Sequence, residues 1–135
     1  MKIGTILVAS VLLAQTAARP TLAADTPAEK FDVFCAEWMH KLEVRERDNQ
    51  RQIHWVPNGQ GVEGQYVGYS SEHVCKVKPQ ADAKAPPVGI IIYTEYRYQK
   101  RGNDAVLAES TAPQAIEATE VTEIFRYGKK GQWEY

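Results

Sequence analysis

Residues 31–42, FDVFCAEWMHKL, decide the fold. Their apolar positions follow helical spacing, i, i+4, i+7 and i+11, and form one stripe: Phe31, Cys35, Trp38 and Leu42. Phe34 widens the stripe, and charged residues occupy the other faces. A helix of this kind buries its apolar stripe against another element. The stretch therefore predicts an amphipathic helix that packs on a partner layer.

The helix has a clear start and a late end. Thr26 suits the N-cap, Pro27 the first helical position, and Glu29 the third position of a capping box. Neither Gly nor Pro follows until Pro57. We expect one long helix over residues 27–52.

Beyond Pro57 the chain is rich in β-branched and aromatic residues, as strands are. The predicted strands are residues 65–69, 73–78, 88–100, 118–127 and 132–135. Short turns favour antiparallel pairing, because parallel strands need long crossovers. The predicted fold class is α+β, with one long N-terminal helix packed on a curved antiparallel sheet of four or five strands. This element order is similar to that of cystatin-like and nuclear-transport-factor-like folds.

Two connections stand out between the strands. Residues 79–87 form a polar segment bounded by prolines. Residues 102–117 are rich in alanine and join two long strands, as a lid or as a disordered segment. Within them, residues 103–109 can form one or two helical turns.

The N-terminus has the layout of a cleavable signal peptide. Lys2 precedes an apolar run, residues 3–14, and small residues lead to a cleavage site after Ala24. The run is shorter than the roughly 20 residues that span a bilayer. We therefore expect a signal peptide over residues 1–24 and a single domain over residues 25–135, which is periplasmic or secreted and leaves the membrane after cleavage.

The charge of the mature chain bounds its partners. Cleavage removes Lys2 and Arg19 and no acidic residue, which leaves 14 basic and 17 acidic residues and a net charge of −3. Such a chain has no excess of positive charge for a phosphate backbone, so nucleic acid is not an expected partner.

Residues 59–64, GQGVEG, fit the G-x-G-x-x-G pattern of dinucleotide sites. In those sites the pattern follows a strand and opens a helix. Here it follows a helix and precedes a strand. We interpret the glycines as a flexible turn into the sheet, with Asn58-Gly59 as the tight bend, and expect no nucleotide or other cofactor.

The only two cysteines, Cys35 and Cys75, are expected to form a disulfide in an oxidising compartment. Two free thiols or a metal site are the alternatives. Cys35 and Met39 are four apart on the helix, and His73 and Cys75 are two apart on a strand, so each pair shares a face. These donors suit copper. A disulfide would remove the thiolates that the metal needs, so we expect no metal.

Polar residues interrupt the helix stripe after Leu42. Arg45, Glu46 and Asn49 either reach solvent at the fading end of the stripe or line a cavity. Tyr96 and Tyr98 share one face of a strand and complete the candidate pocket. The similarity to the cone-shaped folds implies acid–base chemistry, for which the strands offer Glu95, Arg97 or Glu123. No spacing singles out a catalytic pair, and tyrosines are common in ordinary sheets.

The sequence favours a small exported domain without catalysis that binds a protein partner or a small ligand. The alternative is a cavity enzyme resembling small isomerases or dehydratases. A third hypothesis is a copper-handling protein. The ligand, the partner and the oligomeric state stay open.

Overall fold

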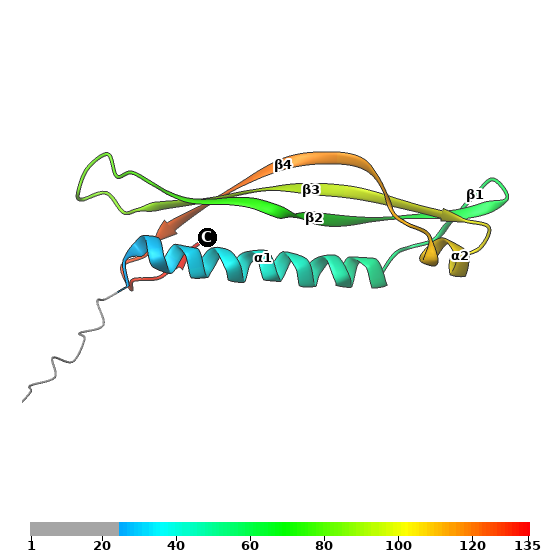
Figure 1. The fold of residues 1–135 in the computed structure, drawn as a ribbon, viewed down its shortest axis with the longest axis horizontal. Coiled ribbons are helices and arrows are strands. Elements are labelled where there is room, and N and C mark those ends of the chain that lie inside the picture. Colours follow the sequence, from blue (N-terminus) through cyan, green and yellow to red (C-terminus); the bar gives the residue numbers. More distant parts are fainter. Residues whose placement is uncertain (1–24) are drawn as a thin grey trace, which may run out of the picture.

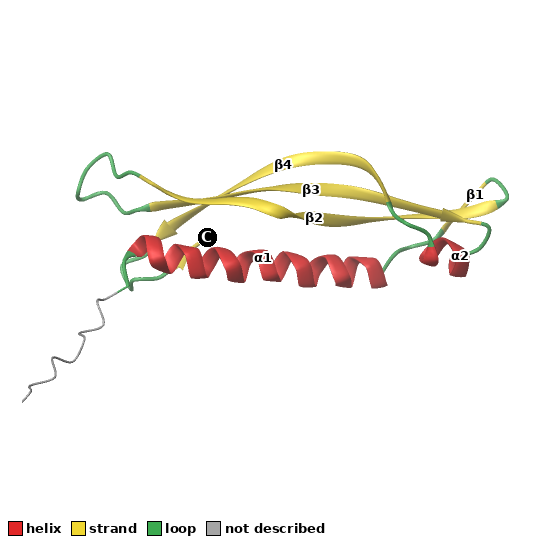
Figure 2. Cartoon of the chain, in the orientation of Figure 1, coloured by secondary structure: helices red, strands yellow, loops and turns green. Residues whose placement is uncertain are grey.

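The computed structural model describes residues 25–135, and the proposed signal peptide lies outside them. One long helix lies along one face of a curved antiparallel sheet of five strands (Figures 1 and 2), as predicted. The elements are α1 (Pro27–Arg51), β1 (Val56–Asn58), β2 (Gly61–Lys78), β3 (Val88–Gly102), α2 (Ala105–Ser110), β4 (Gln114–Tyr127) and β5 (Trp133–Glu134). The α+β architecture is confirmed.

Helix α1 begins with the predicted capping box. Thr26 Oγ1 accepts a hydrogen bond from the Glu29 N–H at 3.2 Å, and the Glu29 carboxylate accepts one from the Thr26 N–H at 2.7 Å. The bond from the Thr26 N–H, aided by one from the Thr26 hydroxyl, lowers the pKa of the Glu29 carboxyl. The bonds of the two N–H groups satisfy backbone donors that a helix start leaves without partners.

The sheet is a meander in which each strand pairs with the next, in the order β1-β2-β3-β4-β5. Strand β2 was predicted as two separate strands, but it is continuous and contains a bulge between Tyr69 and His73. β2 pairs with β3 both before and after the bulge, so the extra residues bend the strand without ending it.

The glycine-rich segment, residues 59–64, begins with a hairpin turn and continues as regular strand. Gly59 has a φ of +64°, which a residue without a side chain adopts at little cost, and it links β1 to β2. Gly61 and Gly64 lie within β2. A Cβ on Gly64 would collide with the side chains of Ile53 and Trp55, so this glycine gives room for packing.

The connection between β3 and β4 is ordered. Asp104 caps α2 by accepting a hydrogen bond from the Leu107 N–H at 2.9 Å, and Ala108 is fully buried. The predicted helical turns are therefore present, and the segment closes one end of the molecule beside β1 (Figure 1).

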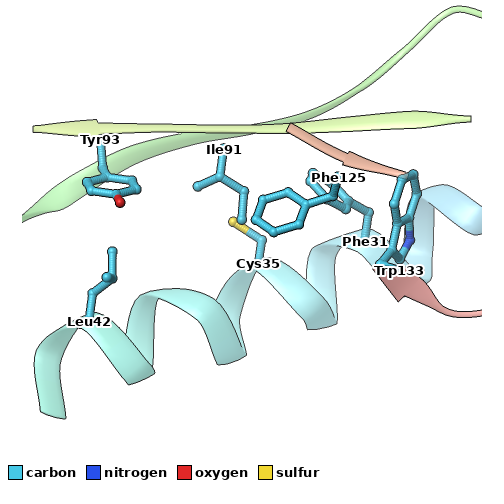
Figure 3. Close-up of a cluster of buried hydrophobic side chains, with 7 residues drawn as sticks. All are labelled: Phe31, Cys35, Leu42, Ile91, Tyr93, Phe125 and Trp133. Atoms are coloured by element: carbon cyan, nitrogen blue, oxygen red, sulfur yellow. The ribbon is translucent and has the colours of Figure 1, made fainter. Parts of the chain in front are cut away.

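The core lies between α1 and the facing side of the sheet (Figure 3). Its buried members are Phe31, Cys35, Leu42, Ile91, Tyr93, Phe125 and Trp133. Phe31 packs against Phe125 and Trp133, with ring centroids 6.3 and 4.6 Å away. Trp133 Nε1 also donates to the Pro27 carbonyl at 3.0 Å, which ties β5 to the start of α1.

A disulfide joins Cys35 on α1 to Cys75 on β2, with the Cα atoms 6.4 Å apart, and this prediction is confirmed. It closes a loop with a sequence separation of 40 residues. Within residues 25–135, neither helix has the length and apolarity needed to cross a bilayer.

Candidate functional site

The bulge of β2 is held in shape by its own polar side chains. Ser70 Oγ donates to the Glu72 carbonyl at 2.6 Å and accepts from the Thr94 N–H at 2.9 Å, so it replaces part of the lost strand pairing. His73 Nδ1 lies 2.7 Å from the Ser71 carbonyl oxygen. Because a carbonyl only accepts, Nδ1 carries the proton in this contact.

A cleft opens between this bulge and the middle of α1. Its volume is about 540 Å³, within the range of small-molecule sites. The lining residues are Ala36, Met39, His40, Leu42, Glu43, Glu46, Tyr69, Ser70, Ser71 and His73. The helix supplies apolar side chains together with His40 and two carboxylates, and the bulge supplies an aromatic ring, two hydroxyls and an imidazole. The lining therefore combines apolar surface with a few convergent polar groups.

Two carboxylates give the cleft its electrostatic character. Glu46 accepts a hydrogen bond from the Tyr69 N–H at 3.0 Å, which links α1 to the edge of the bulge. Glu43 forms an exposed ion pair with Arg47 at 3.3 Å and lies 3.5 Å from His40. Among the described residues that line the cleft, none is Lys or Arg. The cleft should therefore prefer uncharged or cationic ligands to anionic ones.

The disulfide lies next to one wall of the cleft. The ligand atoms of Cys35, His73 and Cys75 all lie within 4.8 Å of one another. Cys35 is only 2% exposed, whereas Cys75 is half-buried and His73 is exposed. The structure thus brings together three of the four predicted soft donors, and the fourth, Met39, lines the cleft.

The five residues of the predicted pocket do not form one site. Arg45 is exposed, and Glu46 lines the cleft. Asn49 donates from Nδ2 to the Val67 carbonyl at 2.8 Å. Glu46 and Asn49 therefore bind the backbone of β2, and this accounts for polar residues on the helix stripe.

Tyr96 and Tyr98 line a second hollow, which shares Tyr69, Ser70 and Ser71 with the cleft. The Tyr98 ring stacks on Tyr66 with centroids 5.2 Å apart. Burial raises the pKa of Tyr98, and the nearby Glu46 carboxylate adds to this shift. Tyr98 thus helps to pack the sheet against the C-terminal part of α1, which carries Glu46.

The strand residues considered for acid–base chemistry lie apart from the cleft lining. Arg97 forms an exposed ion pair with Glu117 at 3.0 Å. Glu123 accepts hydrogen bonds from the hydroxyls of Tyr93, at 3.1 Å, and Tyr135, at 2.6 Å. Burial, aided by the charge of Glu123, raises the pKa of Tyr93. For Glu95 we find no contact that suggests a catalytic role.

Of the five residues of the predicted pocket only Glu46 lines this cleft, because a bulge inside a strand leaves only a weak signal in the sequence. The signal is the polar run Ser70-Ser71-Glu72, which interrupts the alternation on either side of it. Comparison of the chain with protein-family models, with curated proteins and with solved structures finds no match. The geometry of the cleft therefore carries the functional argument.

Proposed function

We propose that this protein is an exported, non-catalytic domain that binds a small, largely apolar ligand in the cleft between α1 and the β2 bulge. The observation that carries the proposal is the lining of the cleft, which combines Met39, Leu42 and Tyr69 with two carboxylates and the hydroxyls of the bulge. Small-molecule sites have this composition.

Export is supported by two features. Residues 1–24 have the layout of a signal peptide. The disulfide between Cys35 and Cys75 is of a kind that persists in oxidising compartments. The proposed location is the periplasm or the cell exterior, and the proposed layout is that of the cystatin-like folds, which the element order supports.

The non-catalytic reading rests on how the polar groups of α1 are used. Glu46 and Asn49 hydrogen bond to the β2 backbone at 3.0 and 2.8 Å. A general acid or base needs a free proton site within reach of a substrate. Their engagement supports a structural role for both residues and a binding role for the cleft.

The test uses two fluorophores that share a ring system and differ in charge, phenylnaphthylamine and anilinonaphthalene sulfonate. We expect the mature chain, residues 25–135, to bind the uncharged dye more tightly, because Glu43 and Glu46 repel the sulfonate. Binding is measured by fluorescence titration at low ionic strength.

A matched pair of variants locates the binding. Ala36 is exposed and lines the cleft, so Ala36→Trp should fill it and weaken binding of the uncharged dye by about tenfold or more, which is about 1.4 kcal/mol. Val44 is 37% exposed on the same helix and is not among the lining residues, so Val44→Trp should leave binding within about twofold. Equal effects of the two substitutions, or tighter binding of the sulfonate, would refute the proposal.

A further inference from the structure

We propose that Cys35, Cys75 and His73 form a Cu(I) site when their disulfide is reduced, and that Met39 serves as an additional donor. The proposal goes beyond ligand binding in the cleft and does not depend on it. It begins from the three ligand atoms, one from α1 and two from β2, that lie within 4.8 Å of one another.

The spacing of these atoms fits a metal ion. Donors bound at about 2.0–2.3 Å around one ion lie roughly 3.5–4 Å from one another. The Cα atoms of Cys35 and Cys75 are 6.4 Å apart, so rotation of the side chains is enough to place the two separated sulfurs at that spacing. The strand geometry points His73 and Cys75 to the same side.

His73 is oriented as metal-binding histidines usually are. Its Nδ1–H donates to the Ser71 carbonyl at 2.7 Å, which leaves the lone pair of Nε2 free in the neutral ring. Histidines that bind metals commonly donate their other N–H to a backbone carbonyl, which fixes the tautomer and the ring. The bulge therefore orients this imidazole before any metal is bound.

The donor set selects the metal. Two thiolates, an imidazole and a thioether are soft ligands, which favour Cu(I) over hard cations. Met39 is four residues after Cys35 on α1 and lines the cleft together with His73. The carboxylates of Glu43 and Glu46 line the same cleft and favour the approach of a cation.

The oxidation state of the cysteines determines whether the site can bind Cu(I). A dithiol reductant attacks the disulfide, and Cys75 is the more accessible sulfur because it is half-buried whereas Cys35 is 2% exposed. The S–S bond breaks, Cys35 leaves as a thiolate, and a second attack by the reductant releases Cys75 and oxidises the reductant to its own disulfide. Cu(I) then binds both sulfurs as thiolates, and each thiol that was protonated releases one proton.

The test compares oxidised and reduced forms of the mature chain under anaerobic conditions. Cu(I) is titrated against the coloured Cu(I) chelator bicinchoninate, and loss of colour reports transfer to the protein. We expect the reduced chain to remove one equivalent of Cu(I), and the oxidised chain to remove none. Removal of equal amounts by both forms would overturn the proposal.

Substitutions assign the donors in the reduced chain. His73→Ala should weaken Cu(I) binding by about tenfold or more, whereas His54→Ala, an exposed histidine beyond the end of α1, should change it by less than about twofold. The double variant Cys35→Ser/Cys75→Ser should remove no Cu(I) from bicinchoninate. Equal affinities of His73→Ala and the parent chain would overturn the assignment.

Loss of the disulfide also removes a cross-link, so folding is followed separately. Cu(I) should raise the urea midpoint of the reduced parent chain, or restore its near-UV circular dichroism if reduction unfolds it, because a ligand that binds the folded site stabilises it. The double variant should show neither effect. If the reduced parent chain bound Cu(I) but showed no rise in urea midpoint and no recovery of near-UV circular dichroism, the claim that the folded structure forms the site would be refuted.

Discussion

The N-terminal part of α1, residues 31–42, and its C-terminal part, residues 43–51, lie along the same sheet but contact it through different groups. The first part inserts Phe31, Cys35 and Leu42 into the core and is cross-linked to β2. The second part contacts β2 through the side chains of Glu46 and Asn49, which bind backbone groups.

This difference explains why the cleft opens where it does. Apolar packing dominates the contact between helix and sheet from Phe31 to Leu42, since protein interiors pack densely. The β2 bulge lies beside the end of this stretch, and after it the hydrogen bonds of Glu46 and Asn49 join α1 to β2. The cleft lies at this junction. The packed part of α1, residues 31–42, which we expect to be the rigid half, adjoins the polar half, residues 43–51. Residues of both halves line the cleft.

The largest effect is expected from Phe31→Ala. Phe31 is fully buried and packs against Phe34, Phe125 and Trp133. Loss of the ring should lower the free energy of unfolding by about 4–5 kcal/mol, because it leaves a cavity in the core. Urea denaturation measures the change. Val33→Ala, at a position 61% exposed on the same helix, is the control and should stay within about 0.5 kcal/mol. Similar losses in both variants would mean that this half is not the rigid one.

Two glycines offer a direct comparison of the halves. A Cβ on Gly89 would collide with several ring atoms of Phe31, which the packed core holds in place. Gly89→Ala should therefore cost about 2–3 kcal/mol. A Cβ on Gly68 would come within 2.7 Å of the Tyr98 ring and 2.8 Å of the Glu46 carboxylate.

Both of these Gly68 neighbours are only partly buried, so they can shift more easily than the fully buried ring of Phe31. Gly68→Ala should therefore cost less than about 1 kcal/mol, measured by urea denaturation alongside Gly89→Ala. A larger loss at Gly68 than at Gly89 would reverse our ranking of the two halves.

The stability at alkaline pH should also depend more on the tyrosine of the packed core than on the tyrosine beside the polar half of α1. Burial raises the pKa of Tyr93 strongly, so the folded chain keeps this phenol protonated at pH values where the unfolded chain has lost the proton. The stabilisation is complete below about pH 10, the ordinary pKa of tyrosine, and declines as pH rises toward the folded-state pKa. The slope is about −1.4 kcal/mol per pH unit.

Urea midpoints between about pH 9 and 12 measure this decline. Tyr93→Phe should make the curve flatter than Tyr98→Phe does, because the pKa of Tyr98 is raised by a smaller burial and by the charge of Glu46. Identical curves for the parent chain and Tyr93→Phe would contradict the prediction.

A similarly small effect is expected from Asn49→Ala, which removes the hydrogen bond to the Val67 carbonyl in the polar half. The loss should be about 1 kcal/mol by urea denaturation, the usual net value of such a bond. Gln50→Ala is the control, because Gln50 is exposed and its contact to Glu46 is long, at 3.5 Å. A loss at Asn49 no larger than at Gln50 would show that this bond does not hold the helix to β2.

Much of the fold could be predicted because its signals are local. Capping by Thr26 and Glu29 and the apolar stripe from Phe31 to Leu42 placed α1 to within one residue at its end. Alternation and β-branched residues located the long strands, although β1 and the first residues of β4 were not anticipated. The even cysteine count in a chain with an export-like N-terminus led to the disulfide.

The candidate site could be predicted only in part, since it depends on distances between elements. Cys35 and Met39 share a helix face, and His73 and Cys75 share a strand face, as their spacing indicates. Arg45, Glu46 and Asn49 were grouped because they continue one stripe, yet Arg45 is exposed, whereas Glu46 and Asn49 bind the backbone of β2.

The sequence by itself determined the long amphipathic helix, the antiparallel strands after it and the partners for a cross-link, because spacing along the chain sets the direction of neighbouring side chains. Only the tertiary structure decided where β2 bulges, that the bulge opens a cleft beside Leu42, and that His73 meets the two cysteines there. Register and bending depend on packing between residues far apart in the chain, and no local pattern records that packing.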